Sequence, residues 1–297
     1  MTGLSDYLAQ NTLNFVGGEA AMPALAARYL ALFTVVGTDA GSGFTEVSGG
    51  AYARVQIAGN AATNNTTASG NATLHFATTP AWVQPGMLVS NSTTPSSIPS
   101  GTTILSVTGT TAVMSANAAG AGVGNGDTIN FSAFAPAASG TAPSTITNGS
   151  IITFPQASAS WGTVLAFGIY DALTSGNLLI WDFLGNFNWL PFEVPTGSNP
   201  SFSVKGNGFA SNDPLVFTNE YGGTLPSAST GTFTGYNVLF AASPATDTTN
   251  VDTVSGPTTP VVLTSSGSGM VRKIVQQPIA INVTPSFAAS TLTATLA

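Results

Sequence analysis

Residues 150–185 have the sequence SIITFPQASASWGTVLAFGIYDALTSGNLLIWDFLG. This stretch is the most apolar part of the chain, and it is rich in Phe, Trp and Tyr, whose side chains remove a large apolar area from water when they are buried. Pro155 and the turn LTSGN (173–177) divide it into three segments of strand-like length. We therefore predict three strands here, at the centre of a hydrophobic core.

The N-terminal residues predict the one helix of the chain. In LSDYLAQNTLNFV (4–16), apolar residues such as Leu8 and Phe15 recur at helical spacing. Ser5, near the start, offers a short acceptor to the first free amides, and Gly17 follows the last apolar position. These signals predict a helix that begins near residue 5 and ends at the glycines.

The rest of the chain predicts short strands and tight turns. LAARYLALFTVV (25–36) is apolar at consecutive positions, which indicates a strand buried on both faces. Thr favours strands, whereas Gly, Asn, Ser and Pro favour turns. After the first residues, the 3.6-residue spacing of Leu, Glu, Lys and Ala that a helical protein needs is absent. Two further β-rich stretches, 71–132 and 199–270, point to the all-β class.

Charged residues are scarce, at 6% of the chain against about 25% in an ordinary domain. The basic residues are Arg28, Arg54, Lys205, Arg272 and Lys273. A protein that binds nucleic acid needs a basic stripe, and the formal net charge of −7 has the opposite sign, so we expect no direct contact with DNA or RNA. Because so few charges repel neighbouring copies, we expect a homo-oligomer.

Sequence features that are missing suggest where the protein is made and whether it binds a cofactor. The chain contains no cysteine, which excludes disulfides and thiolate metal sites. No stretch reaches the roughly 18 apolar residues of a membrane span, and the N-terminus has no pattern of a cleaved export signal. We expect a protein that is made in a cytoplasm, binds no cofactor and has no contact with a membrane.

Candidate catalytic residues are few. His75 is the only histidine, so a metal cluster of several histidines is not available. As a general base His75 would need a nucleophile and an acidic partner, and its place between Leu74 and Phe76 favours projection from a strand face. Asp171 and Asp182 could form the carboxylate pair of a glycoside hydrolase. Asp171, however, begins DALTSGN, where Asp caps its own turn. We predict no catalytic residue and no enzyme activity.

Isolated acidic residues offer the remaining metal candidates, namely Asp127, Asp213, Asp247 and Asp252. A calcium loop gathers several carboxylates at alternate positions, which these residues do not do. Turns explain them as well, and we predict no metal site.

The aromatic segment FLGNFNWLPF (183–192) and the basic pair that follows it later in the chain are the candidate contact residues. Large aromatic side chains dominate both cores and subunit interfaces. The segment can therefore be intrachain core, subunit contact or a sugar-stacking platform, and we predict subunit contact. The candidate interface residues are Phe183, Phe187, Trp189, Phe192, Arg272 and Lys273.

Several segments together resemble a family of small phage and prophage proteins that are labelled tail-fibre or minor virion structural proteins. They are LSDYLAQNTLNFV, YLALFT, TEVSGGAYARVQI and ITFPQASASWGTVLAFGIYDALTSGNLLIW, in this order, followed by the final TLTATLA. Two intervening stretches are similar to modules that recur in phage structural proteins. The first contains GMLVS and GTTILSVTGTTAVMSANA, and the second contains DPLVFTN and GGTLPSASTGTFTGYNVLFAAS.

The resemblance implies that the two stretches are insertions in a shorter protein. An inserted domain needs entry and exit points close together on its host. The fold expected is then all-β, with a β-sandwich-like base domain, one N-terminal helix and two inserted small β domains. The base domain is expected to comprise 1–58, 145–190 and 272–297, and the inserted domains 59–144 and 191–271.

The function implied by the resemblance is that of a non-enzymatic structural protein on the surface of a bacteriophage particle. The helix and base domain would dock on the particle. The leading prediction is an accessory protein that decorates or stabilises the capsid. The alternative is a tail fibre or tail-tip component that binds the host surface, where a glycan would be the ligand. Expected partners are the major capsid or tail protein and further copies of the chain, most simply as a trimer.

Overall fold

The computed structural model confirms the all-β class, with one α-helix and 23 strands in the part of the chain that it describes. The described residues are 3–22, 27–134, 144–185, 187–196, 201–220, 222–229, 236–252 and 260–296.

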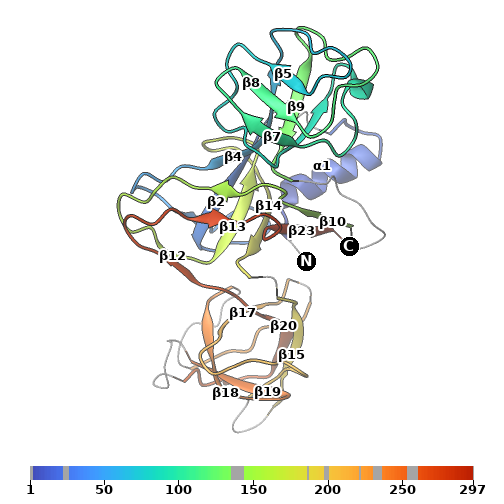
Figure 1. Cartoon of the computed structure of the whole chain (residues 1–297). Coiled ribbons are helices and arrows are strands. Elements are labelled where there is room, and N and C mark those ends of the chain that lie inside the picture. The colour runs from blue at the N-terminus through green and yellow to red at the C-terminus, as the bar shows by residue number, and fades with distance from the viewer. Residues whose placement is uncertain are drawn as a thin grey trace. The chain divides into compact units, whose positions relative to one another are not determined.

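The chain divides into two compact units, each described here by itself (Figure 1). The sheet unit consists of Thr2–Thr34, Thr38–Asp182 and Pro278–Ala297. The barrel unit consists chiefly of Phe183–Gln277, with Val35–Gly37.

One large sheet organises the sheet unit. Its strands follow the order β1-β14-β13-β2-β4-β9-β6, and β3 pairs with β2. Their bounds are β1 Gly3–Leu4, β2 Arg28–Val35, β3 Thr45–Glu46, β4 Val55–Ala62, β6 Leu88–Asn91, β9 Thr128–Ser132, β13 Ala166–Tyr170 and β14 Leu178–Phe183. The order places strands from both ends of 3–183 side by side, so the sheet is built largely from pairings distant in sequence.

Strand β2 lies in the middle of this sheet, as its consecutive apolar residues predicted. Four residues in a row, from Leu30 to Phe33, are at most 3% exposed, which confirms burial on both faces. Its partner β13 supplies Gly168 at a point of close approach. A Cβ on Gly168 would lie 2.6 Å from the Phe33 ring and 2.8 Å from Leu178. The glycine is needed here because β2 and its neighbours leave no room for a side chain.

The stretch 150–185 contains four strands where three were predicted. These are β11 (Ile152–Thr153), β12 (Gly162–Val164), β13 and β14. Leu165 alone separates β12 from β13, and such a short interruption leaves no mark in the apolar pattern.

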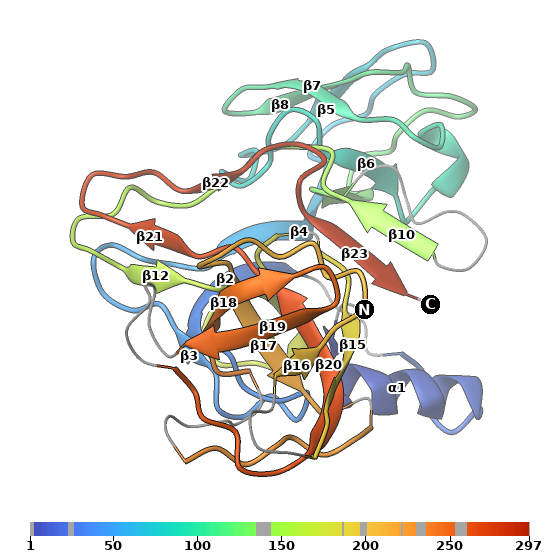
Figure 2. The ribbon, with the colours of Figure 1, turned by 90° about the horizontal axis from the view of Figure 1, so that it is seen from below.

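The C-terminal segment returns to pair with residues around this stretch. Strand β10 (Ser144–Thr147) pairs with β23 (Thr293–Leu296), β11 with β22 (Ser286–Phe287), and β12 with β21 (Gln277–Ile279). Figure 2 shows β23 beside β10 and β21 beside β12. Both ends of the described chain thus contribute strands to the sheet unit.

The first β-rich stretch is joined to the large sheet through backbone pairing. Its strands β6 and β9 extend that sheet, and β9 pairs with β4 from Ala58↔Ser132 to Ala62↔Thr128. The other strands, β5 (Thr73–His75), β8 (Thr111–Met114) and β7 (Ile104–Val107), form a three-stranded sheet. The boundary predicted between 58 and 59 falls inside β4, because the Asn- and Ala-rich residues interpreted as linker form the end of that strand. That this stretch is an insertion stays a prediction.

The barrel unit is a closed barrel with the strand order β15-β16-β19-β18-β17-β20. The bounds are β15 Leu190–Val194, β16 Phe202–Ser203, β17 Pro214–Thr218, β18 Leu239–Ala245, β19 Thr248–Asp252 and β20 Gly267–Lys273. Three phenylalanine rings pack together in its core, among buried aliphatic side chains: Phe192 lies 5.4 Å from Phe202 and 5.3 Å from Phe217, centroid to centroid. A small β unit at 191–271 was predicted from sequence, but closure into a barrel was not.

Candidate functional site

Helix α1 (Asp6–Val16) begins and ends where the sequence predicted. The Ser5 hydroxyl accepts a hydrogen bond from the Leu8 amide at 3.2 Å and donates one to the Leu178 carbonyl, which ties the helix start to β14. At the other end, the Gly17 amide donates to the Leu13 carbonyl at 2.8 Å. The helix is therefore fixed to the large sheet by its first turn.

The last turn of α1 is apolar and exposed. No residue of the helix is buried, and Leu13, Phe15 and Val16 are 69%, 55% and 76% exposed. We call these three residues the apolar helix end. In Figure 2 the later turns of α1 extend beyond the strands of the sheet unit. A helix of 11 residues is marginal in water without tertiary packing, so a surface that covered this end would stabilise it.

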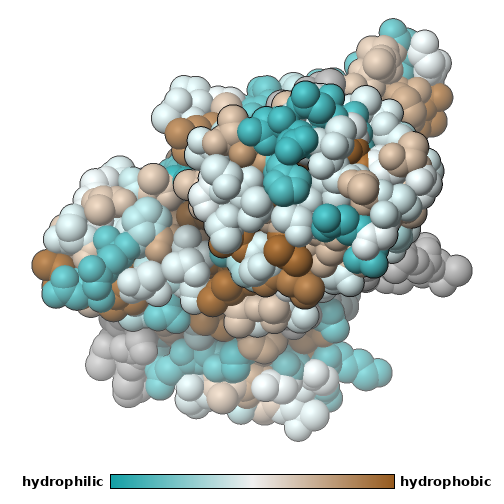
Figure 3. Space-filling model, turned by 45° about the horizontal axis from the view of Figure 1, so that its top comes forward, coloured by the Kyte–Doolittle hydropathy of each residue, from teal (hydrophilic) through white to brown (hydrophobic). Residues whose placement is uncertain are grey.

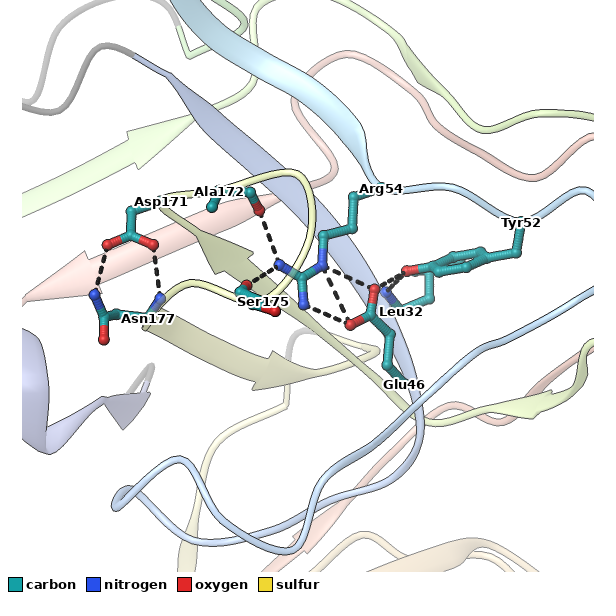
Figure 4. A network of polar contacts seen from close by, with 8 residues as sticks. All are labelled: Leu32, Glu46, Tyr52, Arg54, Asp171, Ala172, Ser175 and Asn177. Carbon is teal, nitrogen blue, oxygen red and sulfur yellow. Dashed lines mark hydrogen bonds and ion pairs between the residues drawn. The ribbon is translucent and has the colours of Figure 1, made fainter.

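A polar network built around Arg54 lies beside β3 and the start of β4 (Figure 4). The Arg54 guanidinium donates to Glu46 through Nε at 2.9 Å and through Nη2 at 2.7 Å. Its Nη1 donates to the carbonyls of Ala172 at 2.8 Å and Ser175 at 2.7 Å. The guanidinium carbon also lies 3.5 Å from the centre of the Tyr170 ring. Arg54 thus fastens the 171–177 turn to β3.

Tyr52 completes the network from the other side of Glu46. Its hydroxyl donates to Glu46 Oε1 at 2.9 Å and accepts from the Leu32 amide at 3.0 Å. Burial raises the pKa of Tyr52 above its ordinary range. Burial by itself lowers the pKa of Arg54, but the hydrogen bond and charge of Glu46 outweigh it, and the pKa lies above its ordinary value. Every group in the network is used within the chain, so its role is to hold turns on the sheet.

Sequence reasoning missed this network. The signal was present, because TEVSGGAYAR places Glu46 and Arg54 on either side of a Gly-Gly turn in a chain with very few charges. Opposite charges that flank a turn pair readily when the turn brings them together.

Most of the candidate carboxylates lie in turns, but two lie in strands. Asp182 belongs to β14, and Asp252 is the buried last residue of β19, so the turn predicted for Asp252 was wrong. Asp171 accepts from the Asn177 amide at 2.6 Å and from the Asn177 side chain at 2.8 Å, which is the capping role that the sequence indicated. Asp127 accepts from the Asn91 side chain at 2.6 Å and from the Gly124 amide at 2.8 Å. These hydrogen bonds lower the pKa of Asp127, and the bond from Asn91 has the largest effect.

Asp213 and Asp247 accept backbone amides in the same way, at 2.8 Å each. Within the described ranges, no three His, Asp or Glu side chains come together as metal ligands. His75 is the last residue of strand β5.

Five of the six predicted interface residues come together at one end of the barrel unit. The rings of Phe183 and Trp189 lie 6.3 Å apart, and Arg272 lies 5.8 Å from the Trp189 ring. Lys273 lies 5.4 Å from the Phe187 ring. We call these five residues, Phe183, Phe187, Trp189, Arg272 and Lys273, the aromatic–basic cluster. The sixth, Phe192, lies apart from them in the barrel core.

Burial limits which of the six residues a partner could touch. Phe183, Phe192 and Arg272 are at most 2% exposed, because the barrel packs around them. Phe187 is 38% exposed, Trp189 is half-buried, and Lys273 forms an ion pair with Asp213 at 2.8 Å. Of the six residues, Phe187, Trp189 and Lys273 have side chains that a partner could contact. That they form a subunit interface stays a prediction.

The visible surface reflects the scarcity of charge. Figure 3 shows a face on which pale colours dominate, between scattered hydrophilic and hydrophobic patches. Such a surface is typical of Ser, Thr, Gly and Ala, and it opposes close contact between molecules only weakly.

A family model described as podophage GP4 fiber I protein gp80 matches residues 3–135 and 89–190. The two matches together span residues 3–190, which is more than half of the chain. The chain belongs to this family. The resemblance to phage virion proteins labelled tail-fibre is thereby confirmed. Comparison with curated proteins gives no match.

The podophage fibre family match covers the apolar helix end, the Arg54 network and every strand of the large sheet. It ends at Leu190, where the first barrel strand begins. The family therefore accounts for the sheet unit up to β14, whereas the barrel follows the matched residues. None of the described helices is long and apolar enough to cross a membrane.

Proposed function

We propose that the chain is a non-enzymatic component of a fibre on the outer surface of the phage particle. The observation that carries this proposal is the match of the fibre family to residues 3–190. The sequence led first to a capsid-decorating protein and second to a tail fibre. The family description favours the fibre. Gold-labelled antibody on intact particles tests the position: label along fibres supports the proposal, and label spread over the capsid contradicts it.

The apolar helix end is the element that we propose for docking on another virion protein. Leu13, Phe15 and Val16 are exposed on the last turn, and Asp6 is the only charged residue of the helix. Covering an exposed apolar side chain contributes roughly 1.5–3 kcal/mol when the burial is complete. The first turn is anchored to β14 through Ser5, so the helix presents its end in a fixed direction.

Replacing Leu13 and Val16 together with Ser is expected to reduce the copies per particle at least about tenfold, which corresponds to 1.4 kcal/mol of lost contact. Both side chains are mostly exposed, so the isolated protein should fold as before. Quantitative mass spectrometry of purified particles, relative to the major capsid protein, measures the copies. Leu105→Ser is the matched control, because Leu105 is 58% exposed on strand β7. Equal incorporation of all three proteins would contradict the docking proposal.

We also propose that copies of the chain associate through Phe187, Trp189 and Lys273 of the barrel unit, as a trimer in the simplest case. Phe187→Ser is expected to raise the dissociation constant of the oligomer about fivefold, since truncating an aromatic contact at an interface costs about 1 kcal/mol. Light scattering during size exclusion, over a series of concentrations, measures this constant. Phe187→Tyr keeps the ring and should associate normally. A wild-type chain that is monomeric throughout the series would refute the association.

A further inference from the structure

The face of the large sheet next to helix α1 contains a hollow of about 480 Å³. Its floor crosses five neighbouring strands, β14, β13, β2, β4 and β9. Adjacent strands lie about 4.8 Å apart, so the floor extends over roughly 19 Å. Apolar side chains dominate the lining, among them Leu8, Ile57, Phe131, Ile146, Ile169 and Leu179. The hollow is therefore long, apolar and within the size range of small-molecule sites.

Among the described residues, Arg28 is the one charged residue that lines this hollow. It is half-buried, and in the described chain its single hydrogen bond runs from Nη1 to the adjacent Ala27 carbonyl at 2.9 Å. Guanidinium has five N–H donors, so most of them remain for another partner. Arg54 and Lys273, by contrast, pair with Glu46 and Asp213.

Burial lowers the pKa of the Arg28 guanidinium and outweighs the charge of Asp171, which also acts on Arg28. The Asp171 carboxylate accepts its hydrogen bonds from Asn177. A partly desolvated charge that is only partly compensated is costly, and a bound anion would reduce that cost.

We propose that the hollow binds an amphiphile whose unbranched alkyl chain lies along the sheet face and whose carboxylate pairs with Arg28. Guanidinium and carboxylate match in a planar, two-hydrogen-bond geometry. A sugar would find too few polar partners in this lining. A peptide strand would meet the face of a sheet, where the backbone groups already pair with one another, and not an edge. The inference is independent of the proposed fibre function.

Isothermal titration of the full chain with dodecanoate and with dodecanol tests the proposal, because the two probes share one alkyl chain and differ in the charge of the head. Dodecanoate is expected to bind at least about tenfold more tightly than dodecanol, as a charge-assisted pair should. Arg28→Leu should remove this preference while retaining dodecanol binding. Ala58→Phe, which places a ring on the floor of the hollow, should weaken both probes.

Lys205→Leu removes an exposed cation of the barrel unit and should leave both affinities unchanged. Equal binding of the two probes to the wild-type chain, or no binding of dodecanoate, would overturn the proposal, and this comparison needs no variant to fold. Unchanged dodecanoate affinity in Arg28→Leu would overturn the role of Arg28.

Discussion

Replacing Phe192 with Ala is expected to lower the free energy of unfolding of the barrel unit by about 3–5 kcal/mol. The Phe192 ring is 1% exposed and contacts the rings of Phe202 and Phe217. It also lies against Gly269 on the facing strand, whose missing side chain makes room for the ring. Truncation would leave a cavity that the closed barrel cannot easily collapse. A domain is commonly stable by only about 5–15 kcal/mol, so the loss is a large fraction.

Hydrogen exchange followed by mass spectrometry measures this effect, because peptides from the barrel strands are observed separately from those of the large sheet. Barrel amides should exchange much faster in Phe192→Ala, and sheet amides as in the wild type. Phe187→Ala is the matched control from the same aromatic segment. Phe187 is 38% exposed, and its truncation should cost less than about 1 kcal/mol. Similar protection in both variants would show that Phe192 is not core.

Replacing Arg54 with Met is expected to destabilise the sheet unit by about 1.5–3 kcal/mol, because it removes one partner of a half-buried ion pair and several hydrogen bonds to a charged group. The Arg54 side chain is 8% exposed and that of Glu46 is 26% exposed. The variant leaves the Glu46 carboxylate without its cation and the carbonyls of Ala172 and Ser175 without their donor. The 171–177 turn should loosen first, and hydrogen exchange of that peptide measures the change.

Two further variants test whether the loss of stability comes from breaking the Arg54–Glu46 ion pair. Replacing Glu46 with Leu in the Arg54→Met background should recover part of the lost stability, because no unpaired charge then remains. Lys273→Met breaks the ion pair with Asp213, in which the Lys273 side chain is 30% exposed, and should cost less than about 1 kcal/mol. If Arg54→Met lowered the free energy of unfolding as little as Lys273→Met, the Arg54 network would not contribute appreciably to the stability of the sheet unit.

Features that depend on neighbouring residues could be predicted from the sequence. Ser5 and Gly17 marked the ends of the helix, since capping involves only the first and last turns. Consecutive apolar residues identified β2, and Asp171 was assigned to a turn that its own carboxylate closes. The all-β class followed from composition, and the phage family from a series of short segments. Each of these conclusions needs only residues close together in the chain.

Which distant segments meet became clear from the three-dimensional fold. The pairing of β4 with β9 carries one sheet across the boundary predicted at residue 58, and β15 closes on β20 some 70 residues later to form the barrel. The same pairing buries Phe192 and leaves Phe187 exposed within one aromatic segment. In the sheet unit, the strand pairing places Arg28 beside an apolar hollow, whereas Arg54 forms an ion pair with Glu46. The physical reason is that a strand pattern specifies which faces are apolar, but not the partner that covers them.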